Sequence, residues 1–316
     1  MLIGAVTVLP LRFALAIFNW VFWYLIMSVC LFSWNRFGPV EMTPTQRYIT
    51  KFCVVGAATV QHMLGLVFVT VKEADFDYSK WLGKGYKTLE LKKCGLYVAN
   101  HVGYYDPDIL AYATFSGMGF VAAEWTRDLP VVGKYISWQE GYFVTRGEKS
   151  ATQKTIDDWN LRTQKIEEGS SNKRPLCVFS EGYHQNGTHL SVFRKGAFEG
   201  LFSVRPAILR YSHNHIMPTC VALKELPLNI LLFCSFTPIY CSVELMPVFT
   251  PNEHLFRQDP GKEKWEVFAE SVRSAMSEYS GFPKDNHRYV DMRAYWDSVG
   301  FRKSWDKSEL KAAKED

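Results

Sequence analysis

A histidine and an aspartate five positions apart, His101 and Asp106, are the residues in this sequence best suited to moving a proton. A neutral imidazole can take a proton from a hydroxyl, and a carboxylate against its other ring nitrogen fixes the tautomer and stabilises the imidazolium. The spacing alone is weak evidence, because His254 and Asp259 share it in a polar stretch that follows no strand. The elements around His101 must therefore be considered.

Residues 96–99, Leu-Tyr-Val-Ala, predict a short buried strand directly before His101. The run Asp106-Pro107-Asp108 predicts the start of a helix, in which Asp106 could act as the cap. His101 is thus expected in a turn at the carboxyl end of a strand, where open α/β sheets place their chemistry. On this motif alone, a catalytic pair and an aspartate that only caps the helix are equally supported.

Polar and basic residues follow further predicted strands in a fixed order along the chain. They are Arg146 at the end of a strand over 141–146, Glu181-Gly182 after a strand over 176–180, Arg194-Lys195 within Phe-Arg-Lys-Gly-Ala-Phe, and Pro206 inside a strand over 204–211.

Together, these ordered motifs resemble those of the glycerophospholipid acyltransferases, above all the lysophosphatidylcholine and 1-acylglycerol-3-phosphate acyltransferase branches. The resemblance spans about residues 89–283. It implies an enzyme that moves a fatty acyl group from acyl-CoA to the free hydroxyl of a lysophospholipid of the lysophosphatidic acid or lysophosphatidylcholine type. His101 would be the general base and Asp106 its partner, with acyl-CoA as cosubstrate and no further cofactor. No metal site is predicted, since the two histidine clusters, His184 with His189 and His213 with His215, have no cysteine or carboxylate at ligand spacing.

The resemblance also assigns residues to the substrates. Arg146 would bind the lipid phosphate. Glu181 and Gly182 would shape the glycerol-phosphate pocket, and we expect Glu181 to hold Arg146 or a glycerol hydroxyl. The remaining candidates are Arg194 and Lys195 for the phosphate and Pro206 for the acyl-thioester side.

The sequence departs from the family pattern at two places. Gly103 stands where the family commonly has serine, and Ser180-Glu181-Gly182-Tyr183 replaces Pro-Glu-Gly-Thr. The second change is expected to put a bulky phenol beside the pocket. The departures keep a second function open, in which the acyltransferase fold serves as a lipid-binding accessory subunit of a larger membrane complex.

Two apolar runs near the N-terminus, residues 13–33 and 52–71, predict a membrane helical hairpin. The second is weakened by Gln61 and His62. A retained anchor is favoured over a secretory signal, because the first run is longer than a signal's apolar core and no small-residue cleavage site follows. The endoplasmic reticulum membrane is expected from the family, with a mitochondrial membrane as the alternative.

After the hairpin, strands alternate with helical patterns, which predicts an α/β fold with a mixed, largely parallel sheet flanked by helices. We expect an anchor over 1–72, a linker over 73–88, an acyltransferase domain over 89–283 and a polar tail over 284–316. The charged end of that tail would fray unless a protein partner held it. The net charge of +4, from scattered basic residues, does not suggest nucleic-acid binding.

Overall fold

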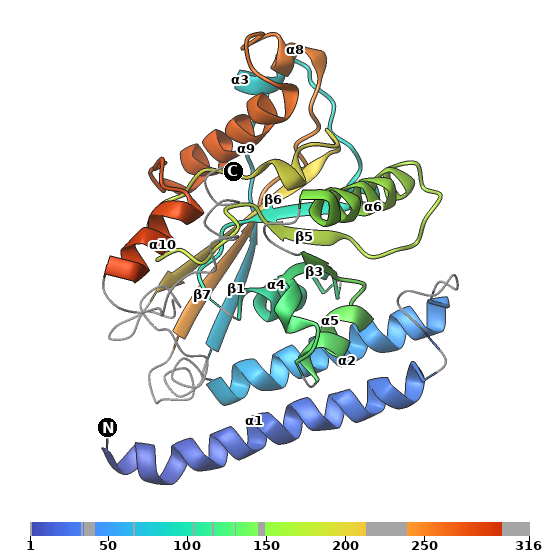
Figure 1. Ribbon diagram of the computed structural model, residues 1–316, viewed down its shortest axis with the longest axis vertical. Coiled ribbons are helices and arrows are strands. Elements are labelled where there is room, and N and C mark those ends of the chain that lie inside the picture. The colour runs from blue at the N-terminus through green and yellow to red at the C-terminus, as the bar shows by residue number, and fades with distance from the viewer. Residues whose placement is uncertain are drawn as a thin grey trace.

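The computed structural model describes residues 2–32, 34, 42–65, 67–103, 105–115, 117–129, 131–144, 149–212 and 239–298. Within these residues, seven strands form one sheet in the order β1-β7-β6-β2-β5-β3-β4 (Figure 1). The strands are β1 (Val67–Glu73), β2 (Leu96–Ala99), β3 (Gly119–Ala123), β4 (Tyr142–Val144), β5 (Leu176–Phe179), β6 (Val204–Ser212) and β7 (Ile239–Leu245). Neighbouring strands are parallel except β6 and β7. The predicted mixed, largely parallel sheet is therefore confirmed.

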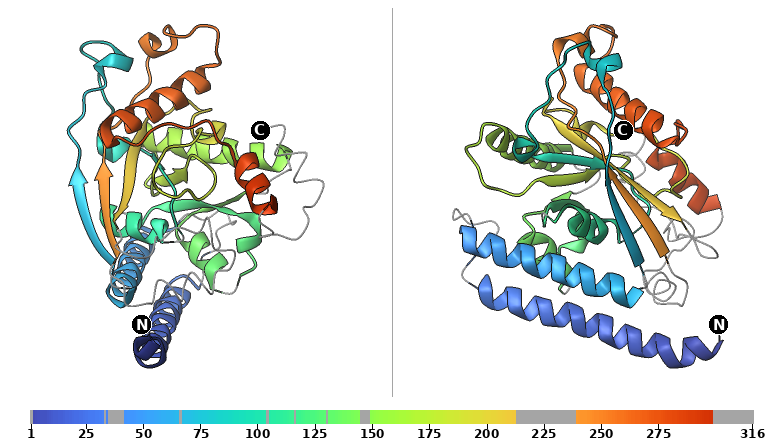
Figure 2. Two further views of the ribbon diagram at one scale, coloured as in Figure 1. Left: turned by 90° about the vertical axis from the view of Figure 1, so that its left-hand side faces the viewer. Right: turned by 180° about the vertical axis from the view of Figure 1, so that it is seen from behind.

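Helices cover both faces of this sheet (Figure 2). They are α1 (Leu2–Cys30), α2 (Pro44–Gly65), α3 (Ser79–Leu82), α4 (Asp106–Thr114), α5 (Val132–Trp138), α6 (Lys149–Glu167), α8 (Glu253–Phe256), α9 (Lys264–Ser280) and α10 (Tyr289–Ser298). Side chains alternate across the pleat, so Tyr97 and Ala99 of β2 join a core with α2 and α4. Leu96 and Val98 join a second core with α6 and α9. Burial on both faces explains why the strand reads as a continuous apolar run.

The second apolar run is not one helix, and that expectation was wrong at its C-terminal end. Helix α2 ends at Gly65, and β1 begins at Val67 and pairs with β7 over seven residues. The alternating, β-branched run Val67-Phe68-Val69-Thr70-Val71 suits a strand. The segment expected as a linker contains α3, whose Trp81 and Leu82 are buried. The sequence also predicts a strand over 216–221 and an apolar interfacial or core segment over 226–240, and these lie wholly and mostly outside the described residues, respectively.

The hairpin itself is present, because α1 and α2 pack side by side in opposite directions (Figures 1 and 2). Asn19, the strongly polar residue of the first apolar run, is buried and donates to the Ala57 carbonyl oxygen at 3.1 Å. Its side-chain oxygen accepts the Trp23 indole N–H at 2.9 Å. A Cβ on Gly56 would lie 2.6 Å from that indole, so only glycine allows this approach. Helix α1 also contacts α5 through the ring pairs Trp20–Tyr135 and Tyr24–Trp138.

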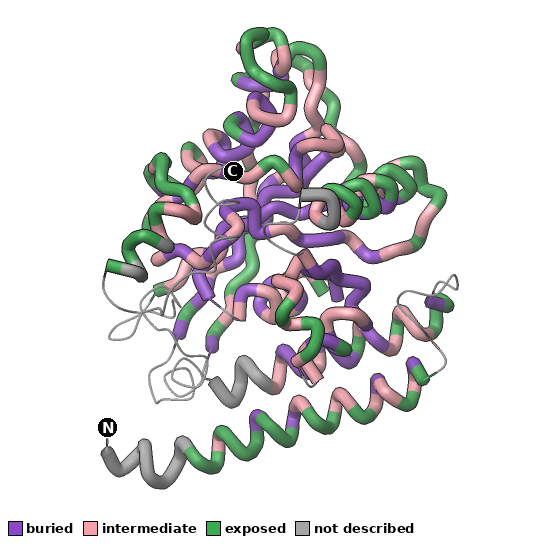
Figure 3. The backbone as a smooth tube through the Cα atoms, in the orientation of Figure 1, coloured by how far each residue is buried: buried purple, intermediate pink, exposed green. Residues whose placement is uncertain are grey.

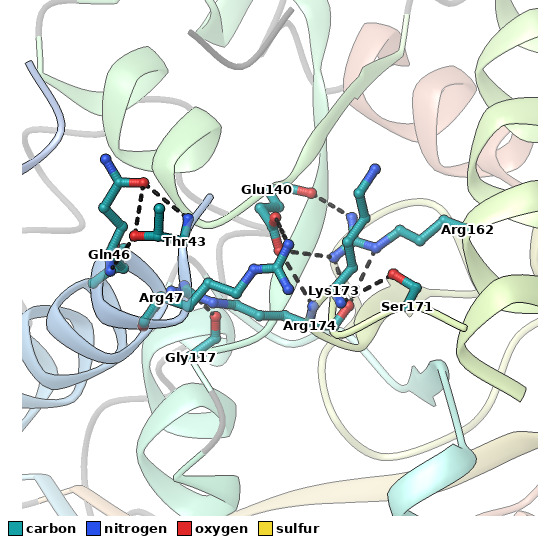
Figure 4. A network of polar contacts seen from close by, with 10 residues as sticks. Thr43, Gln46, Arg47, Gly117, Glu140, Arg162, Ser171, Lys173 and Arg174 are labelled. Carbon is teal, nitrogen blue, oxygen red and sulfur yellow. Dashed lines mark hydrogen bonds and ion pairs between the residues drawn. The ribbon is translucent and has the colours of Figure 1, made fainter. Parts of the chain in front are cut away.

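Helix α2 is fastened to the domain by a buried charge cluster (Figure 4). Glu140, which is 4% exposed, lies 3.6 Å from the Arg47 guanidinium and accepts the Arg174 backbone N–H at 3.2 Å. Arg174 donates to the main-chain oxygens of Arg47 and Gly117, and Arg162 donates to those of Arg174 and Glu140. Burial lowers the pKa of Arg174 to about 10. One carboxylate thus lies within ion-pair distance of two guanidinium groups, those of Arg47 and Arg162, in a site that excludes most water.

We expect Glu140→Gln to lower the free energy of unfolding by about 3 kcal/mol or more, because it leaves buried guanidinium charge without its carboxylate. Thermal unfolding of the detergent-solubilised protein measures this loss. Glu278→Gln is the matched control, since that glutamate pairs with Lys80 on the surface and should contribute under about 1 kcal/mol. An equal effect of both substitutions would contradict the structural role given to the cluster.

Candidate active site

The carboxylate of Asp106 lies against His101 at the carboxyl end of β2. The His101 Nδ1 to Asp106 Oδ2 distance is 2.7 Å, and the same oxygen accepts the backbone N–H groups of Val102 at 2.6 Å and Gly103 at 3.0 Å. The other oxygen accepts the Tyr211 hydroxyl from β6. Asp106 is fully buried and forms no capping hydrogen bond to α4. The structure therefore contains the His101–Asp106 contact and not a capping aspartate, and the catalytic role of the pair stays a prediction.

The His101 imidazole is in contact with two other rings. The Phe179 ring is stacked on it at a centroid distance of 3.8 Å, with 10° between the planes. The His184 ring lies at 4.0 Å and is tilted by 48°. Since Nδ1 is engaged by Asp106, Nε2 is the ring nitrogen left for a reacting proton.

Asn100 ties the end of β2 to β6. Its side-chain nitrogen donates to the Leu209 carbonyl oxygen at 2.9 Å, and its oxygen accepts the Leu209 N–H at 2.8 Å. Both residues are buried, and this pair of hydrogen bonds, which resembles the pairing between neighbouring strands, satisfies two donors and two acceptors. It fixes the point at which the chain leaves the sheet and turns into His101.

Glu181 ties the β5 loop to the β2 loop, which parallel pairing of these strands brings together. One carboxyl oxygen accepts the His101 backbone N–H and the other the Ser191 backbone N–H, each at 3.0 Å. The side chain is fully buried, and burial raises its pKa to about 8 although both hydrogen bonds act to lower it. The carboxyl group therefore holds main-chain amides, where the sequence predicted Arg146 or a glycerol hydroxyl as its partner.

Gly182 and Arg194 belong to the same loop cluster. Gly182 has φ of +77°, and a Cβ there would lie 2.6 Å from the Arg194 side chain, so glycine is required on two counts. The Arg194 backbone N–H donates to the Ser180 carbonyl oxygen at 2.8 Å. The structure thus brings His101, Asp106, Glu181, Gly182 and Arg194 together at one edge of the sheet.

Three other candidates have different surroundings. Lys195 pairs with Glu199 at 2.8 Å and lines a surface hollow with Trp265. Pro206 lies inside β6, opposite Val98 in register, and its carbonyl oxygen accepts the Met246 N–H where β7 has ended. Arg146 lies outside the described residues, in the gap between Val144 at the end of β4 and Lys149 at the start of α6.

The departures from the family pattern leave the His-Asp pair intact. Gly103 supplies a backbone N–H to Asp106. The Tyr183 side chain is buried, and its hydroxyl lies 3.1 Å from Ser191 Oγ and 3.3 Å from the His287 carbonyl oxygen. The phenol therefore packs toward the C-terminal segment.

Sequence reasoning missed several residues of this site. They are Asn100, Tyr211, His184, Ser191 and Asp285. Only the position of Asn100, a buried polar residue between an apolar strand and the histidine, offered a signal.

The region that contains these motifs is similar to known proteins. The family model described as acyltransferase matches residues 83–221. The lysophosphatidylcholine acyltransferase of Drosophila melanogaster is 29% identical over 199 residues, which cover 62% of this chain and 35% of that protein. Human lysophosphatidylcholine acyltransferase 2 is 30% identical over 199 residues, covering 62% and 34%. The lysophospholipid acyltransferase LPEAT1 of Arabidopsis thaliana is 29% identical over 192 residues, covering 60% and 46%.

The alignments span between about a third and a half of the length of these relatives. Among solved structures, the 1-acyl-sn-glycerophosphate acyltransferase PlsC from Thermotoga maritima is similar with a TM-score of 0.43 and 16% identity, covering 93% of this chain and 100% of that one. The matched family model and the curated relatives agree with the ordered motifs, and residues 83–221 of this chain are similar to the acyltransferase family.

Proposed function

We propose that this protein transfers a fatty acyl group from acyl-CoA to the free hydroxyl of a lysophospholipid of the lysophosphatidic acid or lysophosphatidylcholine type. The observation that carries the proposal is the 2.7 Å contact between His101 and a buried Asp106. The names of the relatives, which are lysophospholipid acyltransferases, support the choice of acceptor.

In the proposed reaction, His101 Nε2 removes the hydroxyl proton as the oxygen attacks the thioester carbonyl carbon. The tetrahedral intermediate then expels the CoA thiolate, which receives that proton from His101. Asp106 holds the imidazole in the tautomer with Nδ1 protonated and stabilises the imidazolium between the two steps. Transfer is direct, so no acyl-enzyme forms.

Arg146 and Arg194 are the proposed ligands of the lipid phosphate, because a guanidinium group binds a phosphate through two parallel hydrogen bonds. Arg194 has the better structural support, since it contacts Gly182 in the loop next to His101. Lys195 and Pro206 remain weaker proposals. Glu181 and Gly182 would contribute by shaping the loop.

We also propose that the hairpin holds the protein in a membrane. Among the described residues, Pro10–Cys30 of α1 is the stretch long and apolar enough to cross one. The tube coloured by burial shows α1 largely exposed (Figure 3). Its exposed large apolar side chains are Leu11, Phe13, Leu15, Ile17, Phe18, Val21, Phe22, Leu25 and Val29. An exposed apolar surface of this extent is typical of contact with lipid. The endoplasmic reticulum remains the expected membrane.

The proposed chemistry is tested by acyl transfer from labelled acyl-CoA to a panel of lysolipids. We expect His101→Ala to lower the rate by about 100-fold or more, the usual contribution of a general base. His254→Ala is the matched control, because His254 has the same spacing to an aspartate but lies on α8. Equal rates for the native chain and His101→Ala would remove the catalytic assignment and favour a non-catalytic accessory role.

The proposed membrane contact is tested by sedimentation with phospholipid vesicles. Phe18 and Phe22 are 67% and 45% exposed, and burial of each ring in lipid is worth about 1.5–3 kcal/mol. The double substitution Phe18→Asp, Phe22→Asp should lower vesicle partitioning by on the order of 100-fold. Leu161→Asp on α6, also an exposed apolar position, should leave it unchanged. Equal partitioning of the double variant and the native chain would exclude this face as the contact.

A further inference from the structure

A segment outside the matched acyltransferase region contacts the loop after β5, which is hydrogen-bonded to the backbone of His101. Residues 283–289, here named the C-terminal strap, follow α9, whereas the family model ends at residue 221. The Leu190 N–H donates to the Pro283 carbonyl oxygen at 2.9 Å, and the Asp285 N–H donates to the Leu190 carbonyl oxygen at 3.1 Å. The strap therefore pairs with the β5 loop as a short parallel bridge.

Asp285 is the anchor of the strap. Its Oδ1 accepts the Ser191 hydroxyl at 3.2 Å. Its Oδ2 lies 2.9 Å from a ring nitrogen of His189 and 2.9 Å from one of His287. Burial alone would raise the pKa of Asp285, but the hydrogen bonds from His287 and the charges of both histidines together lower it. Asp285 is therefore an ionised group that holds Ser191 in one orientation.

Ser191 connects Asp285 to Glu181. The serine is fully buried, and its backbone N–H donates to Glu181 while its hydroxyl donates to Asp285. The Gln185 amide donates to the same Oγ, and the Tyr183 hydroxyl lies 3.1 Å from it. The serine hydroxyl therefore has three polar side chains around it, including Asp285.

Glu181 connects Ser191 to His101, because its carboxyl group also accepts a hydrogen bond from the His101 backbone N–H at 3.0 Å. The His101 carbonyl oxygen accepts the Gln185 N–H at 2.6 Å, so the histidine backbone is held on both sides by the loop that Ser191 fixes. A base must be placed to within a fraction of an ångström for proton transfer. The His101 ring has its own contacts, but its backbone depends on this path.

We propose that Ser191 and Asp285 are positioning residues of the active site, which act through Glu181 on the backbone of His101. The C-terminal strap is then part of the catalytic unit, although it lies outside the matched family region. This inference rests on the proposed function for its kinetic consequences only, because the positioning itself can be measured without turnover.

The kinetic test compares Asp285→Ala, Ser191→Ala and the double variant with the native chain. We expect each single variant to lower kcat by about tenfold with little change in the KM for lysolipid, and the double variant to lose no more, because both act on one path. Ser191→Thr, which keeps the hydroxyl, should recover most of the rate. Lys284→Ala is the matched control on the strap, since its side chain pairs with Glu270 away from the loop.

Native kcat in the single variants, or additive losses in the double variant, would overturn the proposal. The second measurement is hydrogen–deuterium exchange of the peptide that contains the His101 amide. Faster exchange in Asp285→Ala, but not in Lys284→Ala, supports positioning, and unchanged exchange overturns it. If the native chain transfers no acyl group, the proposed function fails while this exchange result still decides the role of the strap. Asp285→Asn, the milder change, replaces Asp285→Ala if the latter does not fold.

Discussion

A carboxylate buried at the carboxyl end of β2 is the interaction on which the site depends. Asp106 has lost its contact with water, and a buried carboxylate is tolerated only where donors replace that water. Its four donors come from the imidazole of His101, two consecutive backbone amides and a tyrosine on β6. The turn after β2 must therefore curl around the carboxylate, and this curl holds Nδ1 of His101 against it.

The strand order supplies the remaining partners. β2 lies between β6 and β5, so Tyr211 and Leu209 reach the turn from one side and Phe179 and Glu181 from the other. Helix α4, which begins with Asp106, packs on α2 of the hairpin. The element proposed to contact lipid is thus one helix away from the residue that orients the base. This short connection is consistent with the proposed transfer to a lipid acceptor.

Local patterns predicted much of this fold, and they failed where distant residues decide the outcome. Short apolar runs bounded by turns identified β2 with its observed ends, and β5 and β6 with ends that differ by one residue. The run over 52–71 misled because apolar content alone does not separate a helix from a buried strand. The charge cluster around Glu140 joins α2, α6 and the approach to β5, and no spacing in the sequence records it. The same is true of Asp285, which lies 94 positions from the serine it holds.

The antiparallel hairpin is followed directly by β1, so the first 73 residues also contribute a strand to the sheet. β1 pairs with all seven residues of β7, four of which, Ile239, Cys241, Val243 and Leu245, are buried apolar side chains. β1 itself ends in the charged pair Lys72 and Glu73, which blunts the outer edge. A chain that lacked the first 73 residues would leave β7 paired with β6 alone, with its other edge exposed. Such a fragment would be prone to self-association through this edge, so the hairpin, β1 and the rest of the sheet form one folding unit.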